Sequence, residues 1–172
     1  MSGCASIGFR LHTGWAMLVA VAAEGEVLLV LRRCRVEMLP PGRGRFVYHE
    51  AAELPLPDAE SLIESVRRIV EDTARTALGS AIHDLKVTGA SIPTGPASVP
   101  DDLAAVLRSR RHAGTLTSRR SSCASETYGR ASANAGMAEA DLKAAIDAFR
   151  KALGAPWTRD HKIATAAAHV RA

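Results

Sequence analysis

Apolar residues form short runs in the first part of the chain and fall at helical spacings further along. The first run predicts a strand over about 6–22, and the second predicts a strand over about 26–37. Between them, Glu24-Gly25-Glu26 has the composition of a tight turn, so the two runs are expected to pair as a β-hairpin. Prolines and glycines at 40–44 end the second strand, and a third strand is expected at Arg45–His49.

The later expected elements, in chain order, are a helix at about 58–78, a strand at Lys86–Ile92, and helices at Asp101–Arg110, 138–153 and 158–170. The first helix has the clearest boundaries, because Asp58 can cap its start and Gly79 is a typical stop. Thr158 can cap the last helix in the same way. Strands that alternate with helices predict one α/β domain over 1–172, with a mixed sheet and helices packed on its faces.

Charge changes this picture in one segment. Residues 108–136 contain six arginines and one acidic residue, a net charge of +5, whereas the whole chain carries only +4. The segment is rich in Ser and Gly, and we expect an irregular basic segment over about 108–135, with no regular structure at 112–124. Arg/Ser-rich sequence also arises when a GC-rich gene is read in an altered frame. A natural loop and a frame-altered segment therefore both stay open as interpretations.

The cysteines and the longest apolar run indicate the cellular compartment. Cys4, Cys34 and Cys123 lack the spacing of a zinc site or of a disulfide framework, which favours a reducing cytoplasm. Trp15–Ala23 is an apolar run after Arg10 that ends in small residues, as a secretory signal does, and its alternative interpretation is a buried strand. The run is too short to span a bilayer, so we expect no membrane association.

The N-terminal sequence GFRLHTGWAMLVAV, with a central TGW triplet, is similar to the first strand of Holliday-junction resolvases and their relatives. HTGWA at 12–16, YHEAAELPL at 48–56 and LGAPWTRDHKIATAAA at 153–168 resemble segments of a family of uncharacterised bacterial proteins. The resemblance covers most of the chain except about 108–135 and implies a ribonuclease H-like fold. Active members carry an acidic residue where this chain has Arg10, so the resemblance implies a member without the catalytic acids.

Acidic residues are missing from the strands where a two-metal nuclease would carry them. Residues 5–23 and Lys86–Ile92 contain no Asp or Glu, whereas this chemistry needs several carboxylates around ions roughly 3.5–4 Å apart. His49-Glu50 followed by Glu53 matches only the first half of a zinc-protease motif, and the prolines that follow argue against a helix there. We therefore predict no metal site and no metal-dependent nuclease activity. The chain also lacks the glycine-rich motifs that bind nucleotides, and no cofactor is expected.

Two sets of residues remain as candidate sites. His12 and Thr13 with His49 and Glu50 are candidates for a polar pocket beneath the hairpin, where a histidine pair would do acid–base chemistry. The basic segment offers arginines that can contact nucleic-acid phosphates, namely Arg108, Arg110, Arg111, Arg119 and Arg120.

These features predict a non-catalytic binding module of ribonuclease H-like fold, with nucleic acid as the candidate ligand. One alternative is an enzyme of unknown class that uses His12 and His49. The other is an assembly protein that buries its alanine-rich helices in a homo-oligomer.

Overall fold

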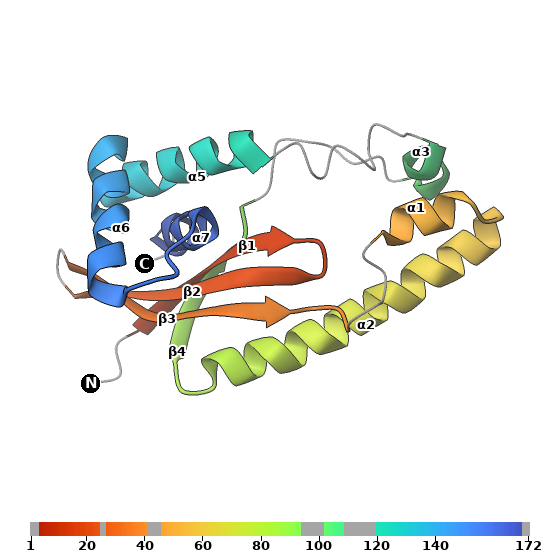
Figure 1. The fold of residues 1–172 in the computed structure, drawn as a ribbon, viewed down its shortest axis with the longest axis horizontal. Helices are drawn as coiled ribbons and strands as arrows, with labels where there is room; N and C mark the ends of the chain where they lie inside the picture. The colour runs from red at the N-terminus through yellow and green to blue at the C-terminus, as the bar shows by residue number, and fades with distance from the viewer. Residues whose placement is uncertain (1–3, 25–26, 41–45, 94–101, 109–119, 170–172) are drawn as a thin grey trace.

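A four-stranded mixed sheet forms the centre of the molecule (Figure 1). The computed structural model describes residues 4–24, 27–40, 46–93, 102–108 and 120–169. β2 runs antiparallel to both of its neighbours, and β4 runs parallel to β1, so the α/β class expected from the sequence is confirmed. The strands lie in the order β3-β2-β1-β4, with the bounds β1 Cys4–His12, β2 Trp15–Glu24, β3 Val27–Glu37 and β4 Lys86–Ser91.

The stretch predicted as one strand at 6–22 is two strands, because the chain reverses at Thr13 and Gly14. His12 pairs directly with Trp15 across this turn. Gly14 has φ of 82°, a left-handed conformation that favours glycine. The prediction was wrong because apolar residues continue on both sides of the turn and conceal it. The second predicted strand is confirmed as β3, and the run Trp15–Ala23 is a buried strand of the sheet.

A helix, α1 Val47–Ala52, stands where a third strand was expected at 45–49. The amides of His49 and Glu50 both donate to the carbonyl of Phe46 and close the first turn. Ala51 is fully buried, and α1 packs against α2 and α3. Tertiary packing of this small residue outweighs the β-propensity of Val47 and its aromatic neighbours. Arg45 lies outside the described residues.

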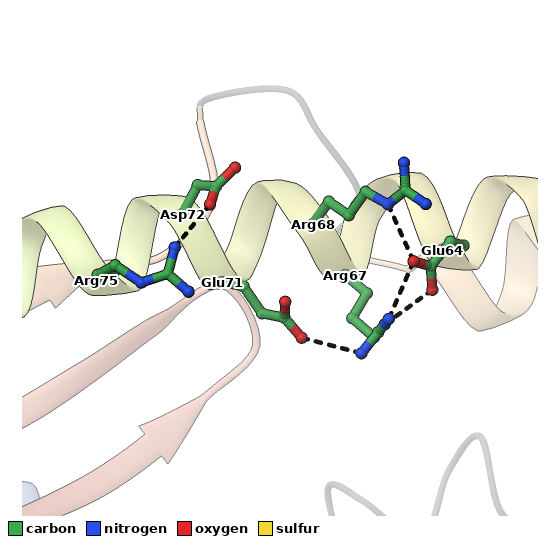
Figure 2. A network of polar contacts seen from close by, with 6 residues as sticks. All are labelled: Glu64, Arg67, Arg68, Glu71, Asp72 and Arg75. Atoms are coloured by element: carbon green, nitrogen blue, oxygen red, sulfur yellow. Dashed lines mark hydrogen bonds and ion pairs between the residues drawn. The ribbon is translucent and has the colours of Figure 1, made fainter.

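The long helix α2 Leu56–Ile82 confirms the predicted helix and extends it at both ends. The expected cap Asp58 lies inside the first turn, because Pro55 occupies the N-cap position. The chain continues in helical conformation through Gly79, where a Cβ atom would meet nothing within 4 Å. The outer face of α2 carries exposed ion pairs (Figure 2). One network joins Glu64, Arg67, Arg68 and Glu71, and Asp72 pairs separately with Arg75. Hydrogen bonds from Arg67 and Arg68 lower the pKa of Glu64 to about 2. This face of α2 is therefore a solvated, charge-balanced surface.

The remaining helices are α3 Leu103–Arg108, α5 Arg120–Ala135, α6 Glu139–Leu153 and α7 Arg159–His169. α3, α6 and α7 confirm the helices expected at 101–110, 138–153 and 158–170. α5 corrects the expectation of an irregular segment over 108–135 for the part from residue 120 onward. Tyr128 and Ala131 of α5 are buried in a cluster with residues of α6 and α7. Residues 109–119 lie outside the described part of the chain.

Helices cover both faces of the sheet (Figure 1). The last turns of α2 pack on one face, against a cluster that includes Ile7, Phe9 and Leu18. α7 packs on the other face, against Met17 and Val19, and α5 and α6 pack against α7. The alanines of α7 are therefore buried within one chain and do not form an exposed surface. Within the described ranges, no helix is both long and apolar enough to cross a membrane.

α7 approaches β1 closely at Gly8. A Cβ atom at this position would lie 1.9 Å from the carbonyl oxygen of Ala164 and 2.4 Å from the amide nitrogen of Ala168. Glycine lets two backbones approach in this way because it has no side chain. The contact sets the position of α7 along β1 and therefore places the first turn of α7 beside the hairpin turn.

Arg32 and Arg33 each hold the end of a helix, one on each face of the sheet. Arg32 donates to the carbonyl of Ala81 near the end of α2 and pairs with Asp84 at 2.8 Å. Arg33 donates to three carbonyls at the end of α6, those of Leu153, Gly154 and Pro156, at 2.7, 3.1 and 2.6 Å. A helix leaves its last carbonyls without partners inside the helix, so a cation stabilises this end.

Candidate functional site

A polar cluster lies where β1 runs into the hairpin turn and meets the start of α7. Nε2 of His12 lies 3.0 Å from Oδ2 of Asp160, and the side chain of His12 is only 10% exposed. Nε of Arg10 lies 3.9 Å from Oδ1 of the same carboxylate. Gly8, Arg10 and His12 alternate along β1 and therefore share the face that α7 covers. Asp160 thus links the two polar side chains of β1 to α7.

An aromatic stack continues the cluster across β2 and β3. The rings of His12 and Trp15 are 3.9 Å apart and inclined by 5°, so they stack face to face. Cζ of Arg35 lies 4.2 Å from the centre of the Trp15 ring, and Arg35 is ion-paired with Glu37. Because the imidazole already covers one face of the indole, the guanidinium must cover the other. Both faces of Trp15 are therefore occupied, and this side chain is not a free platform for stacking a nucleobase.

The first turn of α7 is fixed by Thr158 and His161. The amide of Thr158 donates to Nδ1 of His161 at 3.1 Å, and the Thr158 hydroxyl oxygen lies 2.8 Å from the same nitrogen. Burial and the charge of Arg33 lower the pKa of His161, which favours the neutral ring with Nδ1 as an acceptor. Thr158 stands directly before α7, as expected, and its carbonyl accepts from the amide of Lys162, but its hydroxyl contacts the His161 side chain. This turn holds Asp160 at the positive end of the helix, where a carboxylate is stabilised.

The predicted pocket residues lie in separate surroundings. His12 belongs to the cluster with Asp160 and Trp15, and Thr13 is exposed in the hairpin turn. His49 and Glu50 lie exposed on α1, with the ring of His49 6.1 Å from that of Phe46. The helix at this position also contradicts the expectation that the following prolines prevent one. These contacts give no support to a shared pocket of the two histidines.

The predicted phosphate-binding arginines lie mostly beyond what the structure describes. Arg108 is exposed at the end of α3, 3.8 Å from Asp102. Arg120 is the first residue of α5. Arg110, Arg111 and Arg119 lie outside the described residues.

The cluster has one carboxylate beside β1, opposed by a guanidinium and an imidazole. Across the described ranges, no group of three or more His, Cys, Asp or Glu side chains is arranged to hold a metal ion. Charge balance of this kind suits binding and positioning, whereas two-metal hydrolysis requires several converging carboxylates.

Sequence reasoning missed Asp160 and the packing of Trp15. The available signal was Arg10 itself, because an arginine between buried residues of a strand requires an acidic or ligand partner. The partner, Asp160, comes from the opposite end of the chain, two residues after Thr158, and the first turn of α7 orients it.

Comparisons with known proteins add no relative: no protein-family model matches the chain, and neither a curated protein nor a solved structure matches it significantly.

Proposed function

We propose that this chain is a non-catalytic binding module of ribonuclease H-like fold, with nucleic acid as its ligand. The fold proposal is supported by the strand order β3-β2-β1-β4, in which an antiparallel three-stranded unit is followed by a helix and then by a strand parallel to β1. The resemblance of the first hairpin to that of the resolvases supports the same fold.

The observation that carries the non-catalytic proposal is the side chain at the centre of β1. Arg10 is 7% exposed, occupies the face of the strand beneath α7, and pairs with the nearby carboxylate of Asp160. A cation in this position repels divalent metal ions and attracts anions. The central strand is therefore suited to binding a negatively charged partner and not to holding metals for hydrolysis.

The nucleic-acid proposal rests on the charge of the segment between α3 and α5. Arg108 ends one of these helices and Arg120 begins the other, and the intervening sequence contributes Arg110, Arg111 and Arg119. Clustered arginines bind phosphates and release condensed counterions. Since both faces of Trp15 are covered, we expect binding through phosphates that depends strongly on salt and weakly on base sequence.

The test is binding to labelled single-stranded RNA, duplex DNA and branched DNA over a salt series. The test variant replaces Arg110, Arg111, Arg119 and Arg120 with Gln, and the charge-matched control replaces Arg75, Lys86, Arg150 and Lys151, all of which are exposed where the structure describes them. We expect the salt slope to flatten in the test variant and to persist in the control. An equal loss of affinity in both variants would show that binding depends only on the net charge of the protein. Absence of binding by the wild-type protein at low salt would refute the proposed function.

A further inference from the structure

We infer that Arg10 and the first turn of α7 form a binding site for one phosphoryl group. The first observation is the state of the guanidinium. The Arg10 side chain is 9% exposed, and its Nε atom is buried with no hydrogen-bond partner. In the described part of the chain, its contact with a charged group is the one with Asp160 at 3.9 Å, which is too long for a hydrogen bond.

A buried guanidinium in this state is costly for a folded protein. Arginine carries five N–H donors, and taking its charge out of water is offset only when good acceptors replace the water. The Asp160 carboxylate is shared, because its other oxygen lies 3.0 Å from Nε2 of His12. The site therefore has an N–H donor on Arg10, at Nε, that no acceptor among the described residues satisfies. This donor points to an acceptor from a ligand.

The start of α7 supplies a second source of positive potential at the same place. Asp160 is the second residue of this eleven-residue helix, so its pairing with Arg10 puts the guanidinium beside the first helical turn. The first amides of a helix lack partners inside the helix, and the helix dipole favours an anion there. The Arg10 guanidinium comes from β1 and the helix start comes from α7. Together they match an oxyanion that has several acceptor oxygens.

A phosphoryl group fits this site best because its oxygens can accept from the planar guanidinium and from helix amides together. Asp160 is the competitor for the same donors, and its side chain is 26% exposed, so it can turn outward when a ligand enters. Thr13 and Arg159, the chain neighbours of His12 and Asp160, are both exposed. The inferred ligand is a single phosphoryl group, either as free phosphate or as the terminal phosphate of an oligonucleotide.

The test is calorimetric titration of the full chain with inorganic phosphate, at constant ionic strength maintained with chloride. Arg10→Gln should weaken binding by roughly tenfold or more, because a charge-assisted pair is lost. Arg68→Gln on α2 is the matched control, since it removes the same group from an exposed ion pair, and its affinity should equal that of the wild type. Absence of phosphate binding by the wild type, or equal binding by Arg10→Gln, would overturn the inference.

Asp160→Asn provides a second arm, because Arg10→Gln removes a buried side chain and can prevent folding. Asn keeps the shape of Asp160 and removes the competing charge, so phosphate affinity should rise several-fold. An unchanged or lower affinity would overturn the inference even if Arg10→Gln does not fold.

Oligonucleotides with a 5′-phosphate or a 5′-hydroxyl separate the two phosphate sources. Preference for the phosphorylated end, lost in Arg10→Gln, assigns the site to a nucleic-acid terminus, whereas equal binding of both ends with retained binding of inorganic phosphate assigns it to a free phosphate. The inference does not depend on the proposed function, since the variant at Arg110, Arg111, Arg119 and Arg120 tests that function and leaves Arg10 intact.

Discussion

Replacing Gly8 with alanine should strongly destabilise the protein. The new Cβ atom would lie 1.9 Å from the carbonyl oxygen of Ala164, 2.4 Å from the amide nitrogen of Ala168 and 2.9 Å from the carbonyl carbon of Ala164. All three are backbone atoms, so no side-chain rotation relieves the clash. An ordinary contact requires roughly 3.5 Å, so α7 must move away from β1 by more than about 1 Å. Overpacking of this kind costs about 1–3 kcal/mol, and we expect at least the upper value because a whole helix loses contact.

The sign of the change in the free energy of unfolding is informative, because two contributions oppose each other. The clash destabilises the folded state, whereas alanine reduces the entropy of the unfolded state. Gly8 has an ordinary negative φ, so alanine by itself would stabilise by about 0.4–1 kcal/mol through the unfolded state. Gly79→Ala isolates this contribution, since Gly79 lies within α2 with open space around it, and we expect stabilisation by about 0.5–1 kcal/mol. Urea unfolding measures both variants. If Gly8→Ala were as stable as the wild type, the close approach of α7 to β1 would be refuted.

Two further predictions concern the helix ends. Arg33→Met removes the donors to three carbonyls at the end of α6 and keeps the aliphatic stem, so we expect a loss of about 2 kcal/mol, against less than about 0.5 kcal/mol for Arg75→Met on the exposed face of α2. Equal losses in urea unfolding would contradict this role of Arg33. Burial lowers the pKa of His169 from 6.5, so the folded state binds fewer protons than the unfolded state below that pH. Stability should therefore be highest above pH 6.5 and fall as the pH drops towards the folded-state pKa, and His169→Leu should show a smaller fall between pH 7.5 and pH 5.

The regular elements could be predicted wherever apolar periodicity and end signals agree. α2, α6 and α7 combine helical spacing with a proline, glycine or threonine at an end, and β3 begins with the apolar run Val27–Leu31. Such segments have few competing structures, since local preference and burial agree.

The errors arose where tertiary contacts outweighed the local sequence. α5 has an alanine- and serine-rich sequence, and its helix is held by the burial of Tyr128 and Ala131 against neighbouring helices. The helix at α1 likewise depends on the burial of Ala51 and on the packing of α1 against α2 and α3. A single sequence does not contain these contacts in any local pattern, because the partner surfaces are formed by distant residues.

The candidate site shows the same limit more sharply. His12 was a candidate from its place beside Gly14, but its partner Asp160 lies at the other end of the chain and enters only when α7 docks. Arg10 was interpreted from the sequence as the loss of an acid. In the structure Arg10 is a buried cation with few contacts. The hydropathy pattern of the sequence predicts neither the burial of its guanidinium nor the distance to its partner.

The contact that holds the fold together also positions the inferred phosphate site. Gly8 and Arg10 are alternate residues on one face of β1, and Asp160 lies one helical turn before Ala164 on α7. Any shift that separates Gly8 from Ala164 must therefore also change the spacing of Asp160 from Arg10 and His12. Gly8→Ala should lower stability and alter phosphate affinity together. Leu78→Ala, in the cluster on the opposite face of the sheet, should lower stability through a cavity and leave phosphate affinity unchanged. If Leu78→Ala also altered phosphate affinity, that affinity would follow overall stability, and the coupling would not be specific to the contact between α7 and β1.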